Sequence, residues 1–467
     1  MNAADVLSRL SRRGLFRIKP ELDRMQAIMR ALNDPQEGYP SVHIAGTNGK
    51  GSVAAGLEAV LRAAGKKTGL YISPHLVDLR ERIQISAHPI GQNAFETAAE
   101  TVYQAEKITG LSLTYFEFLT AMAFVAFRNA HVDIAIVEVG LGGLWDATNV
   151  LSHPLLSIIT SIGTDHHQWL GPTRTAIALQ KAGIIKPDGT VISGVRGAPG
   201  RSIAAVAKRQ NASLRQLDRD FKVQPGSSFW LENRQSGLYK NKDGDSLEFI
   251  FGLIGNHQMD NASLVIEAVQ QLRLKGWDIT EGQLLNGLRE IHWPGRFFLR
   301  RQTGQAPILF DGAHNSEAMR AFLGTLRYSP WHHIPKTLIF SSYRDKDYRT
   351  MALLLKRIPQ KIILCRLPGS RGLDTRELSK AFRTLKALVE IVESPQAALR
   401  RALASTPQNH LIMVTGSLAL VGMLLPFVSP LAGEADPQRR VRGPLTPTLS
   451  HKGRGSNLER KSEYAHV

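Results

Sequence analysis

The residues best suited to chemistry stand in a short glycine-rich run, GTNGKGS, which extends from Gly46 to Ser52. An apolar stretch at 42–45 precedes this run, and an alanine-rich stretch with helical periodicity at 52–64 follows it. Glycines let backbone N–H groups approach a phosphate, a helix start adds positive potential, and Lys50 adds a point charge. The hydroxyl of Ser52 can face Mg²⁺. The run therefore predicts a nucleotide-phosphate site, with a structural turn bearing a surface lysine as the alternative.

Further polar residues stand at the ends of apolar runs. Glu138 closes the run DIAIVEVG, where a carboxylate is costly to bury unless it meets a cation or hydrogen-bond donors. It is a candidate Mg²⁺ ligand, and a surface carboxylate at a strand end is the alternative. Asp165 and His166 follow the run SIITSIGT and are expected to open a loop at the same edge of a parallel sheet. Lys181, in LQKAGIIKPDG, would ordinarily be a solvated helix lysine.

The elements that must position these residues follow an α/β pattern. Apolar strand-like runs alternate with helical patterns, which is typical of βαβ units on a mainly parallel sheet. A pause at 293–296 divides two such series, so the 467 residues are expected to form two α/β domains. The expected strands lie at 42–45, 68–72, 133–139, 155–162, 308–310, 337–340, 361–364 and 411–414. We place the domains at 1–295 and 296–430, and the Pro-, Gly-, Ser- and Arg-rich tail at 431–467 is expected to be disordered.

Composition limits the classes of partner. The formal net charge of +18 is spread along the chain and favours anionic ligands such as phosphates and polycarboxylates. No RNA-binding aromatic motif or helix-turn-helix pattern accompanies it, so we expect no nucleic-acid partner. The lone Cys365 excludes an internal disulfide and is expected to be a buried thiol. Residues 411–433 are uncharged, but Gly416 and Pro426 interrupt them, so we expect no membrane span and a cytoplasmic location.

A series of motifs then links the chain to a known family. Between about Leu22 and Gly422 the motifs occur in the order GTNGKGS, YISPHL with ERIQI, LTYFEF, VEVGLGG with DATN, SIGTDH with LG, KAGIIKP, GNHQMDNA, WPGRF, DGAHN and VTGSLALVG. The sequence closely resembles the bifunctional dihydrofolate synthase/folylpolyglutamate synthase family of the Mur ligase superfamily. The resemblance implies an N-terminal P-loop ATPase domain with a mainly parallel sheet, a smaller C-terminal Rossmann-like α/β domain, and an active site in the cleft between them.

The resemblance also implies an activity. Members of this family are ATP-dependent ligases that add L-glutamate to dihydropteroate, which gives dihydrofolate, and to the γ-glutamyl tails of folates such as tetrahydrofolate. The acceptor carboxylate takes the γ-phosphoryl group of ATP, and the amine of glutamate then displaces phosphate from the acyl phosphate. For this chain the resemblance implies ATP with two Mg²⁺ ions, and we expect a monomer.

The matching motifs carry the family's site residues to numbered positions. For the ATP phosphates these are Gly49, Lys50, Gly51 and Ser52, and the nucleotide site is completed by Asn261, Arg296 and Asp311. The implied metal ligands are Ser73, Glu138 and His166, and Lys181 corresponds to a lysine that the family carbamylates. The implied acceptor-binding segments are Thr114, Tyr115, Phe116 and Glu117, and Trp145, Asp146 and Ala147. His314 and Ser417 match glutamate-side and catalytic positions, which join Lys50 and Lys181 as the implied catalytic set.

The chain departs from the family pattern at three positions. Leu144 stands where the family has arginine, Gln180 where it has glutamate, and Ala419 where it has tyrosine. A catalytically weakened homologue is therefore one alternative. A nucleic-acid-stimulated P-loop ATPase, suggested by the basic charge, is another. From the residues alone, Tyr115 and Phe116 would be assigned to a helix core rather than to a ligand site.

Overall fold

The structure is a computed structural model that describes residues 3–13, 21–165, 167–383 and 387–428. All the described residues belong to one compact unit, Met1–Ser429. The tail predicted to be disordered, 431–467, lies outside the described residues.

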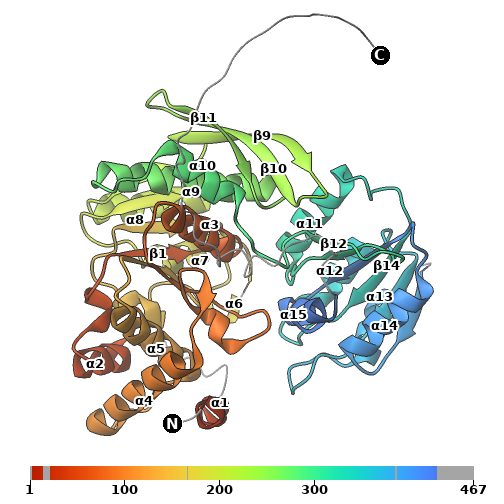
Figure 1. Cartoon of the computed structure of the whole chain (residues 1–467), viewed down its shortest axis with the longest axis horizontal. Helices are drawn as coiled ribbons and strands as arrows, with labels where there is room; N and C mark the ends of the chain where they lie inside the picture. Colours follow the sequence, from red (N-terminus) through yellow and green to blue (C-terminus); the bar gives the residue numbers. More distant parts are fainter. Residues whose placement is uncertain (1–2, 14–20, 166, 384–386, 429–467) are drawn as a thin grey trace, which may run out of the picture. The chain divides into compact units, whose positions relative to one another are not determined.

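The first sheet has eight strands in the order β4-β3-β2-β5-β1-β6-β7-β8 (Figure 1). Neighbours from β2 to β8 are parallel, and β3 and β4 form an antiparallel edge. Four of the predicted strands form β1, β2, β5 and β6, so the prediction of a mainly parallel sheet is confirmed. The strands are β1 (Ser41–Ala45), β2 (Thr68–Tyr71), β3 (Ile83–Ile85), β4 (His88–Pro89), β5 (Ile134–Glu138), β6 (Leu156–Ile159), β7 (Thr190–Ser193) and β8 (Ser213–Gln216).

Successive strand side chains point to opposite faces of this sheet, and in the central strands those on both faces are mainly apolar. Helices therefore cover both faces. On β5, Ile134 and Ile136 pack into a core with α3 (Lys50–Ala63), α9 (Asn256–Leu274) and α10 (Glu281–Arg289). Ala135 and Val137 pack into a second core on the other face. The helices of that face are α1 (Ala3–Arg12), α2 (Asp23–Ala31), α4 (Gln92–Thr109) and α5 (Tyr115–Ala130), with α7 (Arg174–Ala182) and α8 (Gly197–Arg209) beside β6 and β7.

A small antiparallel sheet, which the sequence analysis did not predict, follows the first sheet in the chain. It consists of β9 (Phe221–Phe229), β10 (Arg234–Asn241) and β11 (Ser246–Phe251), and Figure 1 shows it beside α9 and α10. Along β11 buried side chains alternate with exposed or half-buried ones, so one face of the strand packs on the core and the other does not. This sheet extends the core formed by α9 and α10.

The third sheet confirms a second, smaller α/β region. Its order is β12-β13-β17-β14-β15-β16, and all neighbours are parallel except β12 and β13. The strands are β12 (Phe298–Arg300), β13 (Ile308–Phe310), β14 (Lys336–Phe340), β15 (Lys361–Leu364), β16 (Leu388–Ile391) and β17 (Leu411–Thr415). One face packs on α11 (Ser316–Tyr328), α12 (Tyr348–Leu355) and α13 (Thr375–Phe382), and the other on α14 (Pro395–Ser405) and α15 (Leu418–Leu424). All four strands predicted after the pause are present.

Two further expectations concern this second region. The uncharged segment at 411–433 forms β17 and the short helix α15 as far as the structure describes it, and no described helix has both the length and the apolar character needed to cross a membrane. Cys365 follows β15, is fully buried and makes no disulfide. Burial raises the pKa of its thiol to about 12, as suits a packed rather than a reactive cysteine.

Candidate active site

Four neighbouring strands of the first sheet place the predicted site residues at the same edge of that sheet. The loop 46–52 follows β1, Ser73 follows β2, Glu138 ends β5 and Ser161 follows β6, and these strands are adjacent in the order β2-β5-β1-β6. The carboxyl ends of parallel strands are where α/β proteins bind ligands. All these residues line one cavity of about 1890 Å³, which also has lining residues from the third sheet. Because single small-molecule pockets measure about 300–1,000 Å³, this cavity has room for more than one substrate.

The glycine-rich loop has a backbone that only glycine adopts easily at its centre. Gly49 caps α3 with a φ of 90°, and a Cβ there would lie 2.5 Å from Oδ1 of Asn261. Asn261 is held in turn by a hydrogen bond from its Nδ2 to Oε1 of Gln258, at 2.9 Å. A side chain at position 49 would therefore strain the backbone and displace Asn261. The loop and Asn261, which are far apart in the chain, form one local arrangement.

Hydrogen bonds brace this loop against the segment after β6. The backbone N–H of Asn48 donates to Oγ of Ser161 at 3.0 Å, and that of Gly163 donates to Oγ1 of Thr47 at 2.9 Å. Within the loop, Nζ of Lys50 donates to the carbonyl oxygen of Gly46 at 3.1 Å. Ser52 is buried in the first turn of α3. The helix start and a lysine thus converge on one place, the combination that binds phosphate.

Glu138 lies beside Lys50 and Ser73. The residue is only 4% exposed, its Oε1 is 3.7 Å from Nζ of Lys50, and its Oε2 accepts a 3.4 Å hydrogen bond from the N–H of Ser73. Burial raises the pKa of the Glu138 carboxyl, and the charge of Lys50 opposes the rise. The alternative of a surface carboxylate is therefore wrong. The carboxylate of Glu138 and the hydroxyl of Ser73 are hard oxygen donors of the kind Mg²⁺ prefers.

The third predicted metal ligand, His166, lies outside the described residues. Among the residues that the structure describes, no group of three or more His, Cys, Asp and Glu side chains is arranged to hold a metal ion. A metal at Glu138 would therefore depend on oxygen from Ser73, on His166 or on oxygen from a bound substrate, as is usual for Mg²⁺ that accompanies nucleotide phosphates.

Lys181 is not a solvated helix lysine. Its side chain, on α7, is 4% exposed, and its Nζ donates to the carbonyl oxygen of Gly46 at 2.9 Å, the same oxygen that Lys50 contacts. Burial lowers the pKa of the Lys181 amine to about 7, and the nearby charge of Lys50 adds to this effect. A large fraction of an amine with this pKa is neutral at pH 7, and a neutral amine is the form that reacts with CO₂ or other electrophiles.

The third sheet contributes Arg296, Asp311, His314 and Ser417 to the cavity. Asp311 follows β13 and accepts hydrogen bonds of 2.8 Å from the N–H groups of Phe297 and Ala313. Burial raises its pKa to about 6, although Arg296 opposes the rise. Nδ1 of His314 donates to the carbonyl oxygen of Gly312 at 2.9 Å, and burial lowers the pKa of the ring to about 4. The imidazole is therefore neutral at pH 7, with Nε2 left as an acceptor.

Ser417 has a visible local role. It is 3% exposed and caps α15, since its Oγ accepts a 3.1 Å hydrogen bond from the N–H of Ala419. The position places the hydroxyl at the carboxyl end of β17, on the cavity wall. Helix capping accounts for a serine here without any catalytic role, so its contact with a substrate stays a prediction.

The first predicted acceptor segment lies at the start of α5, where it both caps the helix and lines the cavity. Thr114 and Glu117 form a capping box, in which the Thr114 N–H donates to Oε2 of Glu117 at 2.7 Å. Tyr115 is buried in the core around α5, whereas the half-buried Phe116 packs against Gly140 at the end of β5. All four residues of the segment line the cavity. The aromatic pair therefore belongs partly to the helix core and partly to the cavity wall.

The second predicted acceptor segment presents a large aromatic surface. Trp145 is 49% exposed, although it lines the cavity. Asp146 next to it is buried, and its carboxylate accepts hydrogen bonds from the N–H groups of Leu141 and Thr148 at 2.8 and 3.0 Å. Ala147 is buried at the start of a short 3₁₀ helix. Asp146 thus holds the loop in place, while an exposed tryptophan offers a flat face to a ring system.

Contacts between the first and third sheets cross the cavity. Nδ2 of Asn315 donates to Oδ1 of Asn48 at 3.0 Å, and Nζ of Lys346 lies 2.8 Å from Oδ2 of Asp165. Oε2 of Glu317 accepts from the N–H of Thr164 at 3.3 Å. These contacts bring the segment after β6 to the loops that follow β13 and β14, and so hold the two walls of the cavity together.

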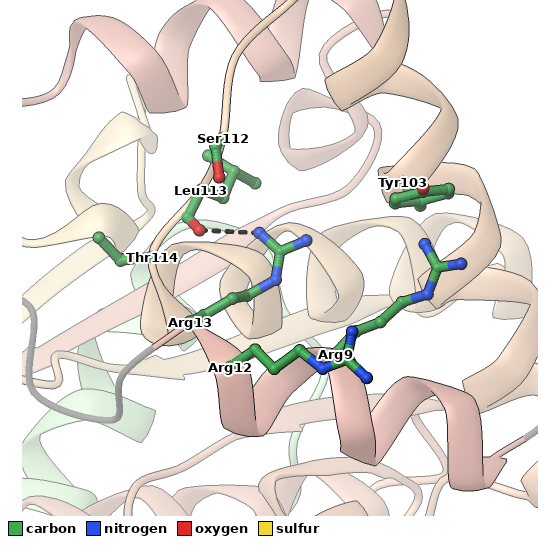
Figure 2. A pocket seen from close by; sticks show the side chains of 7 residues that line it. All are labelled: Arg9, Arg12, Arg13, Tyr103, Ser112, Leu113 and Thr114. Carbon is green, nitrogen blue, oxygen red and sulfur yellow. Dashed lines mark hydrogen bonds between the residues drawn. The ribbon is translucent and has the colours of Figure 1, made fainter.

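A smaller cavity, of about 360 Å³, adjoins the acceptor segment at Thr114 (Figure 2). Arg13 bridges its wall, with Nη1 donating to Oε1 of Glu106 at 2.6 Å and to the carbonyl oxygen of Leu113 at 2.8 Å. The guanidinium of Arg9 lies 4.1 Å from the ring centre of Tyr103. Arg13 therefore fixes the backbone just before Thr114 and so helps to position the acceptor segment.

Several residues that line the cavity were not predicted as site residues from the sequence. They are Arg82, Trp169, Arg174, His257, Arg320, Arg344 and Lys346. Arg82 belongs to ERIQI, so a motif could have singled it out, but no motif covers Arg320 or Arg344. Trp169 is 47% exposed despite lining the cavity, and an apolar side chain with so much exposed surface is a signal visible only in the structure.

Family models agree with this architecture. The model described as the Mur ligase middle domain matches residues 44–269, and the model described as the Mur ligase glutamate ligase domain matches residues 295–418. The chain belongs to the Mur ligase family, and within it to the folylpolyglutamate synthase and dihydrofolate synthase group. Relatives from that group are 31–34% identical to this chain over more than four fifths of its length.

Three of these relatives illustrate the match. Folylpolyglutamate synthase of Lacticaseibacillus casei is 34% identical over 405 residues, which cover 85% of this chain and 92% of that protein. Dihydrofolate synthase/folylpolyglutamate synthase of Bacillus subtilis is 31% identical, with coverage of 87% and 94%. A probable bifunctional folylpolyglutamate synthase/dihydropteroate synthase of Haloferax volcanii is 32% identical over 87% of this chain, but the match spans only 48% of that longer protein.

A solved structure gives the same result in three dimensions. The structure of Escherichia coli FolC in complex with DHPP and ADP superimposes with a TM-score of 0.83, at 28% identity, over 92% of this chain and 98% of that one. The two-domain Mur ligase fold expected from the motifs is therefore confirmed.

Proposed function

We propose that this chain catalyses the ATP-dependent addition of L-glutamate to dihydropteroate and to the γ-glutamyl tails of folates. The observation that carries the proposal is the single large cavity, which joins the loop 46–52, the aromatic acceptor segments and the third-sheet residues Asp311 and His314. The relatives are named for these activities, and the solved FolC structure is a complex with DHPP and ADP. A three-substrate ligase needs such a shared cavity, since its substrates must react with one another.

ATP would place its phosphates on the loop 46–52, where Lys50 and the start of α3 supply positive charge. Asn261, Arg296 and Asp311 would contact the remainder of the nucleotide. Mg²⁺ fits the oxygen donors of Glu138 and Ser73, with His166 as the further proposed ligand; when bound, it neutralises phosphate charge in the transition state. Lys50 and Arg296 would stabilise the same developing charge from the protein side.

The acceptor would lie along Thr114–Glu117 and Trp145–Ala147, with its carboxylate directed at the γ-phosphate. The carboxylate oxygen attacks phosphorus, ADP leaves, and an acyl phosphate forms. The amine of glutamate then attacks the acyl carbon, and the phosphate departs with the bond electrons. Neutral His314, with Nε2 free as an acceptor, would accept a hydrogen bond from the amine of glutamate and take the proton that its nitrogen loses once it has bonded to the acyl carbon. Ser417 would hold glutamate from the end of β17.

We propose that Lys181 works as a carbamate. A buried amine with a lowered pKa reacts readily with CO₂, and the product is an anion that would lie beside Lys50 and the metal site. The conversion replaces an amine repelled by Lys50 with a carboxylate attracted to it. The hydrogen bond to Gly46 places the modified group at the phosphate loop.

The two departures Leu144 and Gln180 are consistent with retained activity. The N–H of Leu144 donates to the carbonyl oxygen of Gln180 at 2.8 Å, so the two positions are neighbours. If the arginine and glutamate expected here formed an ion pair, their joint replacement leaves no unpaired charge. We therefore propose an active ligase rather than a weakened homologue.

We also propose a domain boundary near Gly295 and Arg296, and action as a monomer. The boundary is supported by the change from the first core to the third-sheet cores and by the interval between the family models. The monomer is supported by a cavity whose two walls come from one chain.

The direct test measures phosphate release from MgATP with single substrates left out. With dihydropteroate and glutamate, and separately with tetrahydrofolate and glutamate, we expect turnover of about 1–10³ s⁻¹, the usual range for enzymes. Omission of glutamate or of the acceptor should reduce the rate to background. Product from only one acceptor would restrict the function to that activity, and phosphate release that responds to DNA or RNA but not to glutamate would overturn it.

A further inference from the structure

The lysine and arginine side chains that line the large cavity differ in whether they already form a hydrogen bond or ion pair with another group of the protein. Most donate hydrogen bonds to a carbonyl oxygen, a ring nitrogen or a carboxylate. These engaged cations and their partners are Lys50 with Gly46 and Glu138, Lys181 with Gly46, Arg82 with His75, Arg174 with Ile162, Lys346 with Asp165, and Arg371 with Asp345. Arg296 lies close enough to Asp311 for the carboxylate to affect its pKa.

Arg320 and Arg344 are the exceptions. Both line the cavity, both are exposed, and neither side chain makes a hydrogen bond or ion pair with any residue in the described part of the chain. An arginine that faces a cavity without an acidic partner leaves a full positive charge available to a ligand. The cavity wall built on the third sheet therefore carries two unmatched guanidinium groups.

Their positions relate them to the reacting edge. Arg320 lies one helical turn after Glu317 on α11, and Glu317 contacts the N–H of Thr164. Arg344 precedes Lys346 by two residues in the loop after β14, and Lys346 pairs with Asp165. Residues three apart on a helix share a face, so Arg320 and Glu317 lie on the same side of α11. Each arginine thus lies within three residues, along the chain, of a residue that contacts the segment after β6.

The chemistry of the proposed substrates points to carboxylates as the ligands. Free glutamate carries two carboxylates, and each glutamyl unit of a folate tail carries one more. A guanidinium group binds a carboxylate through two parallel hydrogen bonds, which gives arginine an advantage over lysine in recognising this group. The two unmatched arginines belong to the third-sheet region and the aromatic acceptor segments to the first region of the chain, and all of them line the same cavity.

We infer that Arg320 and Arg344 form a subsite for the carboxylates of a glutamyl unit. The inference rests on the proposed function and adds a specificity determinant to it. The carboxylates can come from the incoming glutamate or from the existing tail of a folate acceptor, and the same two arginines suit either source. Dihydropteroate has no glutamyl unit, so it separates the two.

The test compares steady-state constants of Arg320→Ala, Arg344→Ala and the double variant with those of the unaltered chain. Loss of a charged hydrogen bond should raise the relevant KM about tenfold for each single variant, while kcat and the KM for ATP stay nearly unchanged. If the subsite holds the incoming glutamate, the KM for glutamate rises with dihydropteroate and with tetrahydrofolate alike. If it holds the tail, the KM of polyglutamylated tetrahydrofolate rises while that of dihydropteroate does not.

Matched controls come from exposed arginines that do not line the cavity. Arg327 lies on the same helix as Arg320, and Arg357 lies after α12; the control variants are Arg327→Ala and Arg357→Ala. Both should leave every KM within twofold, and Arg344→Lys should recover part of the loss because it keeps the charge but not the paired geometry. The inference is overturned if the double variant leaves the KM of glutamate and of every acceptor within twofold, or raises only the KM for ATP. Absence of glutamate-dependent turnover in the unaltered chain is a separate outcome, which would count against the proposed function.

Discussion

Replacement of Lys50 by alanine is expected to lower kcat for phosphate release by about 100- to 1,000-fold, the usual cost of removing one group that stabilises transition-state charge. The reason is geometric. Nζ of Lys50 lies between the carbonyl oxygen of Gly46 and the carboxylate of Glu138, at 3.1 and 3.7 Å, so its charge is fixed at the start of α3. Phosphoryl transfer is helped mainly by positioned positive charge. Steady-state phosphate release with all three substrates measures the effect.

The control for this variant is Lys275→Ala, which removes an exposed lysine after α9 and outside the cavity. It should retain the unaltered rate. Thermal unfolding of Lys50→Ala should still show a folded protein with one cooperative transition, because the residue lines the cavity and is not part of a hydrophobic core. Turnover of Lys50→Ala within about threefold of normal would show that the nucleotide phosphates lie elsewhere.

The second large effect is expected at Lys181. Lys181→Ala should reduce turnover about 1,000-fold or more if the carbamate acts beside the phosphates, because both its anion and its position are lost. Short carboxylates such as acetate should restore part of the rate by filling the space the carbamate leaves. Partial rescue is the informative outcome, since a purely structural lysine would not be replaced by a carboxylate. Near-normal turnover of Lys181→Ala without any additive would contradict the carbamate role.

A pH dependence arises from the lowered pKa of this amine. With a pKa of about 7, roughly 10% of the Lys181 amine is neutral at pH 6 and roughly 90% at pH 8. Enzyme freed of CO₂ and then supplied with bicarbonate should therefore regain activity about ninefold faster at pH 8 than at pH 6, once the rates are corrected for the CO₂ present. An equal rate of recovery at the two pH values would indicate that another step controls it.

Much of this site could be predicted because its residues follow apolar runs. The loop 46–52 follows the run that forms β1, Glu138 ends the run that forms β5, and parallel strands end at one edge of a sheet. Ser73, by contrast, is predicted only from the family resemblance. The sequence could not decide whether Glu138 was buried. Only the packing of β5 between β1 and β2, and of Lys50 beside it, settles that the carboxylate is enclosed.

Contacts between distant segments could not be predicted in the same way. Lys346 and Asp165 are 181 residues apart, and neither an apolar period nor a chemical motif marks Lys346 as a partner. The sheet of β9 to β11 is not predicted because most side chains of β9 are exposed and those of β10 and β11 are buried only at alternate positions, which gives a weaker apolar signal than a strand buried on both faces. From periodicity alone Phe116 is a helix-core residue, and only the family resemblance indicates an acceptor-binding role. The side chain both packs against the core and lines the cavity.

The most direct test of the central claim follows the oxygen atoms of the acceptor carboxylate. Dihydropteroate labelled with ¹⁸O in its carboxylate is incubated with the enzyme, MgATP and glutamate, and the released phosphate is analysed by mass spectrometry. If the carboxylate takes the γ-phosphoryl group, each phosphate carries one ¹⁸O atom from the acceptor. Amide formation that yields phosphate free of the label would contradict transfer of the phosphoryl group to the acceptor within this cavity.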